Sequence, residues 1–114
     1  FQNAAITGAY LQKRLAEFSD HPLVGEVRGS GLLGAIELVA NKEQGTPFLG
    51  GAVGGYAQKM AQDNGLLIRA VAGSSLGFCP PLIITEEQID EMIAKVGSAL
   101  DQTYIHCQKH GLLV

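Results

Sequence analysis

Apolar residues recur at helical spacing near both ends of the chain. Residues 3–18 contain one apolar stripe, and residues 89–100 contain a second stripe. Thr85 and Gln88 precede the second stripe in the pattern of a capping box. We therefore predict a first helix over 3–18, and a last helix that begins after Thr85 and continues to about Lys109. The stripes consist of Ile6, Tyr10, Leu11, Leu15 and Phe18, and of Ile89, Met92, Ile93, Val96 and Leu100.

The segment after the first helix has the composition of a strand pair. Residues 24–28 and 33–39 are rich in β-branched and other apolar residues, and the glycines of 29–31 predict a turn between them. In a regular strand, alternate residues point to the same face. We therefore expect Val24, Glu26 and Arg28 to share one face.

The second half of the chain repeats the change from helix to strands. Residues 41–55 contain five glycines and one proline, which predicts a loop. A helix is expected over 53–64, ended by Gly65 in the left-handed conformation. Residues 66–71 and 76–79 predict two more strands, and the last ends where Pro80 and Pro81 follow.

These elements together predict an α+β fold with a small, mostly antiparallel sheet covered by helices. The order is helix, two strands, loop, helix, two strands, helix, without an internal repeat. A chain of 114 residues that is 46% hydrophobic and 17% charged is sufficient for one folded domain. The first residue is Phe1 and not Met, so we expect a piece or a processed product of a longer chain.

Charge and hydropathy exclude two classes of partner. The formal net charge is −3, and the few Lys and Arg residues form no basic stripe, so we expect no nucleic-acid partner. The apolar runs GLLGAIELVA and LGFCPPLIIT are about half as long as the roughly 20 residues that a membrane-spanning helix needs, so no membrane partner is expected. With no signal peptide at the start, a cytoplasmic protein is the expectation.

The cysteines and histidines do not predict a metal site. Cys79 and Cys107 are too few for a disulfide framework and are expected to be reduced thiols. His106 and His110 lie four residues apart, with Cys107 between them, but no further ligand follows at the spacing of a zinc site. We expect solvated polar residues there and no bound metal.

The segment GSGLLG at residues 29–34 matches the pattern G-x-G-x-x-G of dinucleotide-binding loops. Such a loop follows a strand and begins a helix, and an acidic residue follows about 20 residues later. A strand is expected before the glycines, but a second strand and not a helix is expected after them. The region 20 residues on is GGAVGG, which contains no acid. We therefore predict that Gly29 and Gly31 serve a tight turn between two strands.

Two long segments carry a resemblance to a known family. HPLVGEVRGSGLLGAIELV, and then GLLIRAVAGSSLGFCPPLIITEEQIDEMIAKVGSALDQT, resemble the C-terminal small domain of class III (ω-type) aminotransferases. The combination of V-R-G-x-G-L at 27–32 with P-P-L-I-I-T at 80–85 is the most specific part of the resemblance. It covers the chain from about residue 3 to about residue 104.

The resemblance implies an enzyme of which this chain is one domain. Class III aminotransferases are homodimers that use pyridoxal 5′-phosphate (PLP) to move an amino group from an amine or ω-amino acid to a keto acid such as pyruvate. Their large domain holds the lysine that binds PLP. The five lysines here match no such motif and are expected to be solvated, so the isolated chain should bind no cofactor and be inactive. They are Lys13, Lys42, Lys59, Lys95 and Lys109.

One residue is expected to carry function by this resemblance. Arg69 lies in an otherwise apolar strand, and an unpaired charge there is costly. In many class III aminotransferases an arginine of this strand binds the substrate carboxylate, a role for which the guanidinium fork is suited. The alternative is an arginine at a strand edge paired with Glu26 or Glu37. Arg28 is expected to be structural, fixing the loop or a domain contact.

A second class of function is a free-standing binding module without chemistry of its own. The missing lysine domain favours it, and residues 45–55 would be its binding loop. We rank this alternative below the aminotransferase domain.

Overall fold

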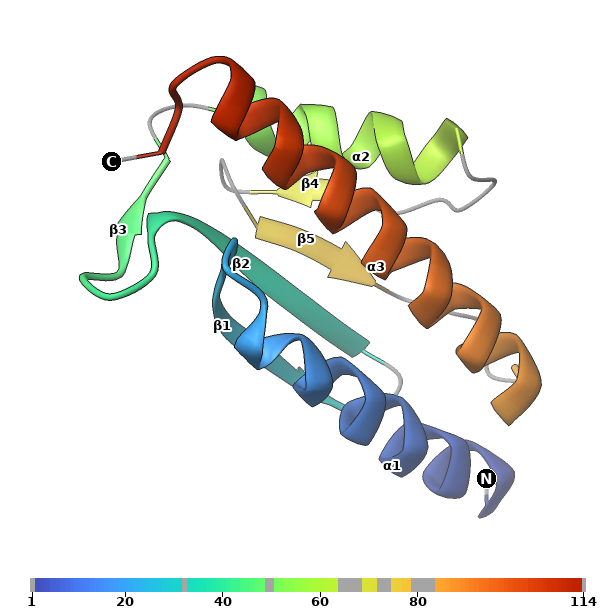
Figure 1. Cartoon of the computed structure of the whole chain (residues 1–114). Coiled ribbons are helices and arrows are strands. Elements are labelled where there is room, and N and C mark those ends of the chain that lie inside the picture. Colours follow the sequence, from blue (N-terminus) through green and yellow to red (C-terminus); the bar gives the residue numbers. More distant parts are fainter. Residues whose placement is uncertain are drawn as a thin grey trace.

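The computed structural model describes residues 2–31, 33–48, 51–63, 69–71, 75–78 and 84–113, with the side chains of residues 2–5 and 69–71 outside the described part. Its elements alternate between helices and strands along the chain (Figure 1). They are α1 (Gln2–Ala16), the 3-10 helix η1 (Glu17–Asp20), β1 (Val24–Ser30), β2 (Leu33–Asn41), β3 (Thr46–Pro47), α2 (Ala52–Asp63), β4 (Arg69–Val71), β5 (Ser75–Phe78) and α3 (Glu86–Lys109).

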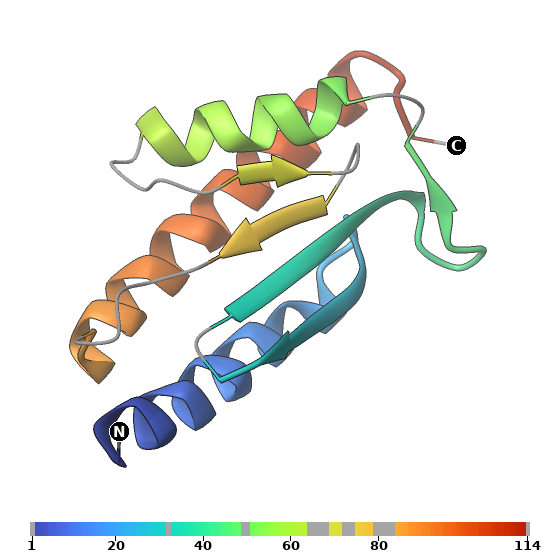
Figure 2. The same ribbon diagram turned by 180° about the vertical axis from the view of Figure 1, so that it is seen from behind.

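The strands form one antiparallel sheet in the order β1-β2-β5-β4, and β3 pairs with the end of β2. Helices α1 and α3 cover one face of this sheet, and α2 runs beside β4 (Figures 1 and 2). Seen from the opposite side in Figure 2, the strands lie in front of α1 and α3. The α+β prediction is therefore confirmed.

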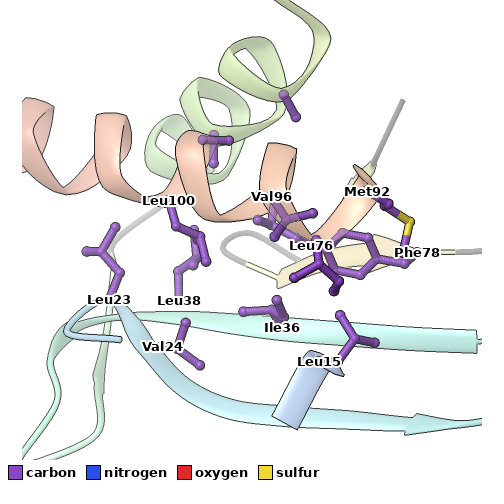
Figure 3. Packing of buried hydrophobic residues seen from close by; sticks show 14 of the residues in the cluster. Leu15, Leu23, Val24, Ile36, Leu38, Leu76, Phe78, Met92, Val96 and Leu100 are labelled. Atoms are coloured by element: carbon purple, nitrogen blue, oxygen red, sulfur yellow. The ribbon is translucent and has the colours of Figure 1, made fainter. Parts of the chain in front are cut away.

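The core lies between the sheet and helices α1 and α3 (Figure 3). Ile36 and Leu38 of β2 and Leu76 of β5 are fully or almost fully buried against Val96 and Leu100 of α3. Burial of apolar side chains of this size is the main favourable contribution to folding, at about 1.5–3 kcal/mol for each one. Apolar contacts to α3 thus hold both halves of the chain together.

Helix α3 begins as predicted. The Thr85 hydroxyl accepts from the Gln88 backbone N–H at 3.2 Å, and the Gln88 side chain accepts from the Thr85 N–H at 3.0 Å. This reciprocal capping box satisfies two donors that a helix start leaves free. The helix continues to Lys109, so both of its expected ends are confirmed.

Polar contacts fix α1 against α3. The Asp90 carboxylate accepts from Arg14 Nη1 at 2.7 Å and from the Tyr10 hydroxyl, and Arg14 Nε lies 3.3 Å from Glu17. The hydrogen bond to Asp90 raises the pKa of Tyr10, because it stabilises the protonated hydroxyl.

Ile6 does not follow the rest of its predicted stripe. Its side chain is 63% exposed and lies at the edge of an open hollow of about 410 Å³ between the starts of α1 and α3.

The prediction that Val24, Glu26 and Arg28 share a face is wrong, because a β-bulge interrupts β1. Val24 pairs with Leu38 and Glu26 with the adjacent Glu37, so two steps on β1 match one step on β2. The extra residue is Gly25, whose added Cβ would lie 2.4 Å from a Val39 methyl. The bulge moves the next residues to the other face, so Val24 is buried while Glu26 is exposed.

Two further boundaries differ from the sequence-based expectation. Residues 41–55 do not form one uninterrupted loop, because Thr46 and Pro47 pair with β2. A strand of two residues is too short to show the alternation of apolar and polar residues by which strands are predicted, and the sequence around it is rich in glycine. Strand β1 also extends through Gly29 and Ser30, so the turn comes later than expected. The predicted cap at Gly65, the first part of the strand over 66–71, and Cys79, Pro80 and Pro81 lie outside the described residues.

Candidate functional site

The glycines of the G-x-G-x-x-G pattern lie at the tip of the β1–β2 hairpin. Gly31 has φ of +58°, in the left-handed region that glycine adopts without strain. The Gln12 side chain of α1 donates to the carbonyls of Gly31 and Leu33, both at 2.8 Å. Gln12 was not singled out from the sequence, because its acceptors are about 20 positions away.

The other glycines provide room where helix α1 meets this hairpin. An added Cβ at Gly29 would lie 2.5 Å from both the Leu33 carbonyl oxygen and Gln12 Oε1, and one at Gly34 would lie 2.5 Å from Leu15 Cδ1. Strand β2, and not a helix, follows the pattern. The expectation that it is no dinucleotide loop therefore agrees with the fold, although Gly29 serves close packing and not the turn itself.

Arg69 is the first residue of strand β4. Of the strand predicted over 66–71, the structure describes residues 69–71. It pairs with Gly77 of β5, Gly77 pairs with Ala35 of β2, and Ala35 pairs with Arg28 of β1. These four positions form one row across the sheet. Each step between strands is about 4.8 Å, so positions 69 and 28 are about 14 Å apart. The side chain of Arg69 lies outside the described residues.

Arg28 occupies the opposite end of this row, and its side chain contacts both Glu26 and Glu37. Its Nη1 lies 3.5 Å from a carboxylate oxygen of Glu26 and 3.4 Å from one of Glu37. All three side chains are between 37% and 57% exposed, so each ion pair contributes little to stability. The two acids that were the alternative partners of Arg69 thus contact Arg28, which supports the structural interpretation of Arg28.

All five lysines of the chain fall within the described residues, and the sequence predicts that none of them is the lysine that binds PLP. That lysine forms a Schiff base inside a site where an Asp or Arg also contacts the pyridine nitrogen. Lys13, Lys59 and Lys109 are exposed, and Lys95 is half-buried on α3.

Lys42 is exposed, as expected, but its ammonium is not free. Its ammonium donates to the backbone carbonyls of Ser19, His21 and Val24 at 2.5–3.0 Å. These carbonyls lie in η1, in the connection after it and at the start of β1, so the three protons of Nζ fix η1 to β1. As for Gln12, the partners are remote in sequence, and nothing around Lys42 in the sequence indicates them.

Replacing Lys42 by methionine should lower the free energy of unfolding by about 2 kcal/mol, because charge-assisted hydrogen bonds contribute about 1.5–3 kcal/mol. Urea denaturation monitored by circular dichroism measures this change. Lys59→Met on α2 is the matched control: Lys59 is also exposed but donates to no backbone carbonyl among the described residues, so its effect should stay within about 0.5 kcal/mol. Equal effects of the two substitutions would show that the carbonyl contacts of Lys42 contribute nothing.

The histidines at the end of α3 stack with a tyrosine of α2. The Tyr56 and His106 rings are 3.8 Å apart between centroids and nearly parallel, and His110 lies 4.4 Å from His106. Desolvation, and then the proximity of His110, lower the pKa of His106. Within the residues that the structure describes, no three His, Cys, Asp or Glu side chains are grouped so that they could hold a metal.

Two remaining features concern Cys107 and membrane insertion. Cys107 is a fully buried free thiol, and burial raises its pKa, which makes it a poor nucleophile. Among the described helices, none combines the length and the apolar character that crossing a bilayer requires.

Comparisons with known proteins agree with the resemblance in the sequence. The family described as aminotransferase class III matches residues 1–100. Putrescine–pyruvate aminotransferase of Pseudomonas aeruginosa is 48% identical over 99 residues, which cover 87% of this chain and 22% of that protein. Diaminobutyrate–2-oxoglutarate transaminase of Halomonas elongata is 43% identical over 105 residues, covering 88% of this chain and 22% of that protein.

Solved structures give the same result for the fold. A transaminase with L-alanine superposes with a TM-score of 0.88 and 44% identity, covering 93% of this chain and 25% of that one. The ω-transaminase of Pseudomonas jessenii in complex with PMP superposes with a TM-score of 0.85 and 40% identity, covering 96% and 24%. The chain thus spans about a fifth to a quarter of the length of these relatives.

Proposed function

Because this chain belongs to the class III aminotransferase family, we propose that it is the smaller, C-terminal domain of a PLP-dependent aminotransferase. The whole enzyme transfers an amino group from an amine or ω-amino acid to a keto acid such as pyruvate. The observation that carries the proposal is the family match over residues 1–100. Relatives named for putrescine and pyruvate, and for diaminobutyrate and 2-oxoglutarate, support an amine donor and a keto-acid acceptor.

The catalytic lysine and the PLP site belong to the large domain of the same polypeptide. This part of the proposal is supported by the positions of the five lysines, of which Lys42 is bound to carbonyls and the others lie on the surface or half-buried on α3. When bound in the large domain, PLP supplies the electron sink of the reaction. The isolated chain is therefore inactive. The full-length enzyme is a cytoplasmic homodimer.

The contribution of this domain to catalysis is substrate binding by Arg69. Its guanidinium pairs with the carboxylate of an amino acid or keto acid and orients the substrate. Two observations support this role. The neighbouring positions in its row, Gly77 and Ala35, have no side chain or only a methyl group, which leaves room beside the strand. The acids that would otherwise neutralise Arg69 already contact Arg28.

The proposal is tested by comparing this chain with the polypeptide encoded by its whole reading frame. We expect the full-length protein to retain PLP through gel filtration and to form alanine from putrescine and pyruvate, and the 114-residue chain to do neither. Transamination by the 114-residue chain alone would contradict the assignment of the lysine to another domain. A reading frame that begins near Phe1 and gives no PLP binding would instead support a free-standing binding module.

A further inference from the structure

Strand β1 forms one edge of the sheet, and this edge has no partner among the described residues. β2 pairs with one side of β1, and no described strand pairs with the other side (Figure 1). β1 is seven residues long, and all of its residues after Val24 are exposed or half-buried. A free strand edge presents backbone N–H and C=O groups that can pair with a further strand.

The charges on this edge are not balanced within one copy of the chain. Glu26 pairs directly with Glu37 across the two strands, and like charges at directly opposite positions are destabilising. One cation, Arg28, lies 3.4–3.5 Å from both carboxylates. The group of three has a net charge of −1, and Glu26 and Arg28 are more than half exposed. Both side chains can therefore contact a strand added beside β1.

The charge pattern specifies which strand fits best. A strand added antiparallel to β1 is favoured when it has a cation opposite Glu26 and an anion opposite Arg28. β1 itself has this pattern if two copies pair about Val27. Glu26 of each copy then lies opposite Arg28 of the other. A parallel pairing in register would instead oppose Glu26 with Glu26.

Steric and apolar contacts agree with the same register. In an antiparallel pairing about Val27, Gly25 lies opposite Gly29, so no bulky side chains meet at these positions. The two Val27 residues lie opposite each other, and β-branched residues form favourable cross-strand pairs. Val27 packs against the core cluster, so this pairing extends the apolar side of the sheet into the second copy.

We propose that the β1 edge binds the β1 edge of a second copy of this chain, with Glu26 and Arg28 as reciprocal partners. The pairing joins the two sheets into one continuous sheet. The proposal rests on residues of β1 alone and not on the proposed function.

The experiment measures self-association of the 114-residue chain by sedimentation velocity over a concentration series up to the millimolar range. The average mass should rise from 12.0 kDa toward twice that value with increasing concentration. Glu26→Arg and Arg28→Glu each place like charges opposite each other, and each should weaken self-association about tenfold or more. Circular dichroism confirms that both variants are folded.

Two further samples separate charge pairing from a loss of stability. An equimolar mixture of the Glu26→Arg and Arg28→Glu chains restores opposite charges between unlike copies, so it should associate more strongly than either variant alone. The double variant with both substitutions should again associate with itself. Glu91→Arg changes the net charge as Glu26→Arg does, but it lies on the exposed side of α3 and should have no effect.

Three outcomes would overturn the proposal. One is a wild-type chain that stays monomeric over the whole concentration range. The second is a Glu26→Arg chain that associates as strongly as wild type, which would indicate another surface, such as exposed Ile6 or Leu33. The third is a mixture of the two single variants that remains monomeric.

Discussion

In the full-length aminotransferase that we propose, Arg69→Ala should lower kcat/KM for carboxylate-bearing amino donors about 10- to 100-fold while changing kcat/KM for plain amines little. The physical reason is the loss of a bidentate, charge-assisted pair, which contributes about 1.5–3 kcal/mol. Because the contact is to the substrate and not to a reacting bond, the loss should appear for every carboxylate substrate. Steady-state kinetics with an ω-amino acid and an amine of equal chain length measures the ratio.

Two control variants make this prediction specific. Arg69→Lys keeps the charge but not the fork, so its effect on the carboxylate substrate should be intermediate. Arg28→Ala removes a cation from the same cross-strand row at a position about 14 Å away, and it should not change the preference between the two substrates. An equal loss for both donors in Arg69→Ala would exclude a carboxylate-binding role.

Gly29→Ala should destabilise the domain by about 3 kcal/mol, although it adds only one methyl group. The added Cβ would lie 2.5 Å from the backbone oxygen of Leu33 and 2.5 Å from Gln12 Oε1. Overpacking of this kind typically costs about 1–3 kcal/mol, and the two hydrogen bonds of Gln12 to the hairpin would be strained as well. Urea denaturation gives the change in the free energy of unfolding.

Gly55→Ala is the matched control for this substitution. Gly55 lies in α2, and no atom lies within 4 Å of a Cβ added there. Alanine favours a helix over glycine by about 0.5–1 kcal/mol, so Gly55→Ala should stabilise the domain by that amount. An equal free energy of unfolding for Gly29→Ala and Gly55→Ala would contradict this prediction. It would mean that the hairpin can move away from α1 without loss of stability.

These glycines also show which parts of the fold the sequence can predict. The capping box at Thr85 and the apolar stripe of α3 are patterns within a few residues, and both are confirmed. The bulge at Gly25 is not such a pattern, because it follows from the pairing of β1 with β2, where a Cβ at position 25 would meet Val39, 14 positions later. The same holds for the hydrogen bonds of Lys42 and Gln12, whose acceptors follow from tertiary structure.

The candidate site divides in the same way. A lone charge in an apolar strand made Arg69 a candidate from the sequence, and its role in substrate binding stays a prediction. Its neighbours Gly77 and Ala35 could not be identified in advance, because they follow from the pairing of β4 with β5 and of β5 with β2. The contact of Arg28 with both acids likewise depends on the register after the bulge.

Helix α3 has a consequence for synthesis on the ribosome. It follows every other described element in the chain, and its side chains bury both the β1–β2 half and the α2–β5 half of the core. Until α3 leaves the exit tunnel, Ile36, Leu38 and Leu76 have no helix of this size to cover them. The core of this domain therefore cannot close until α3 has been synthesised, and the first 85 residues expose their apolar side chains until then.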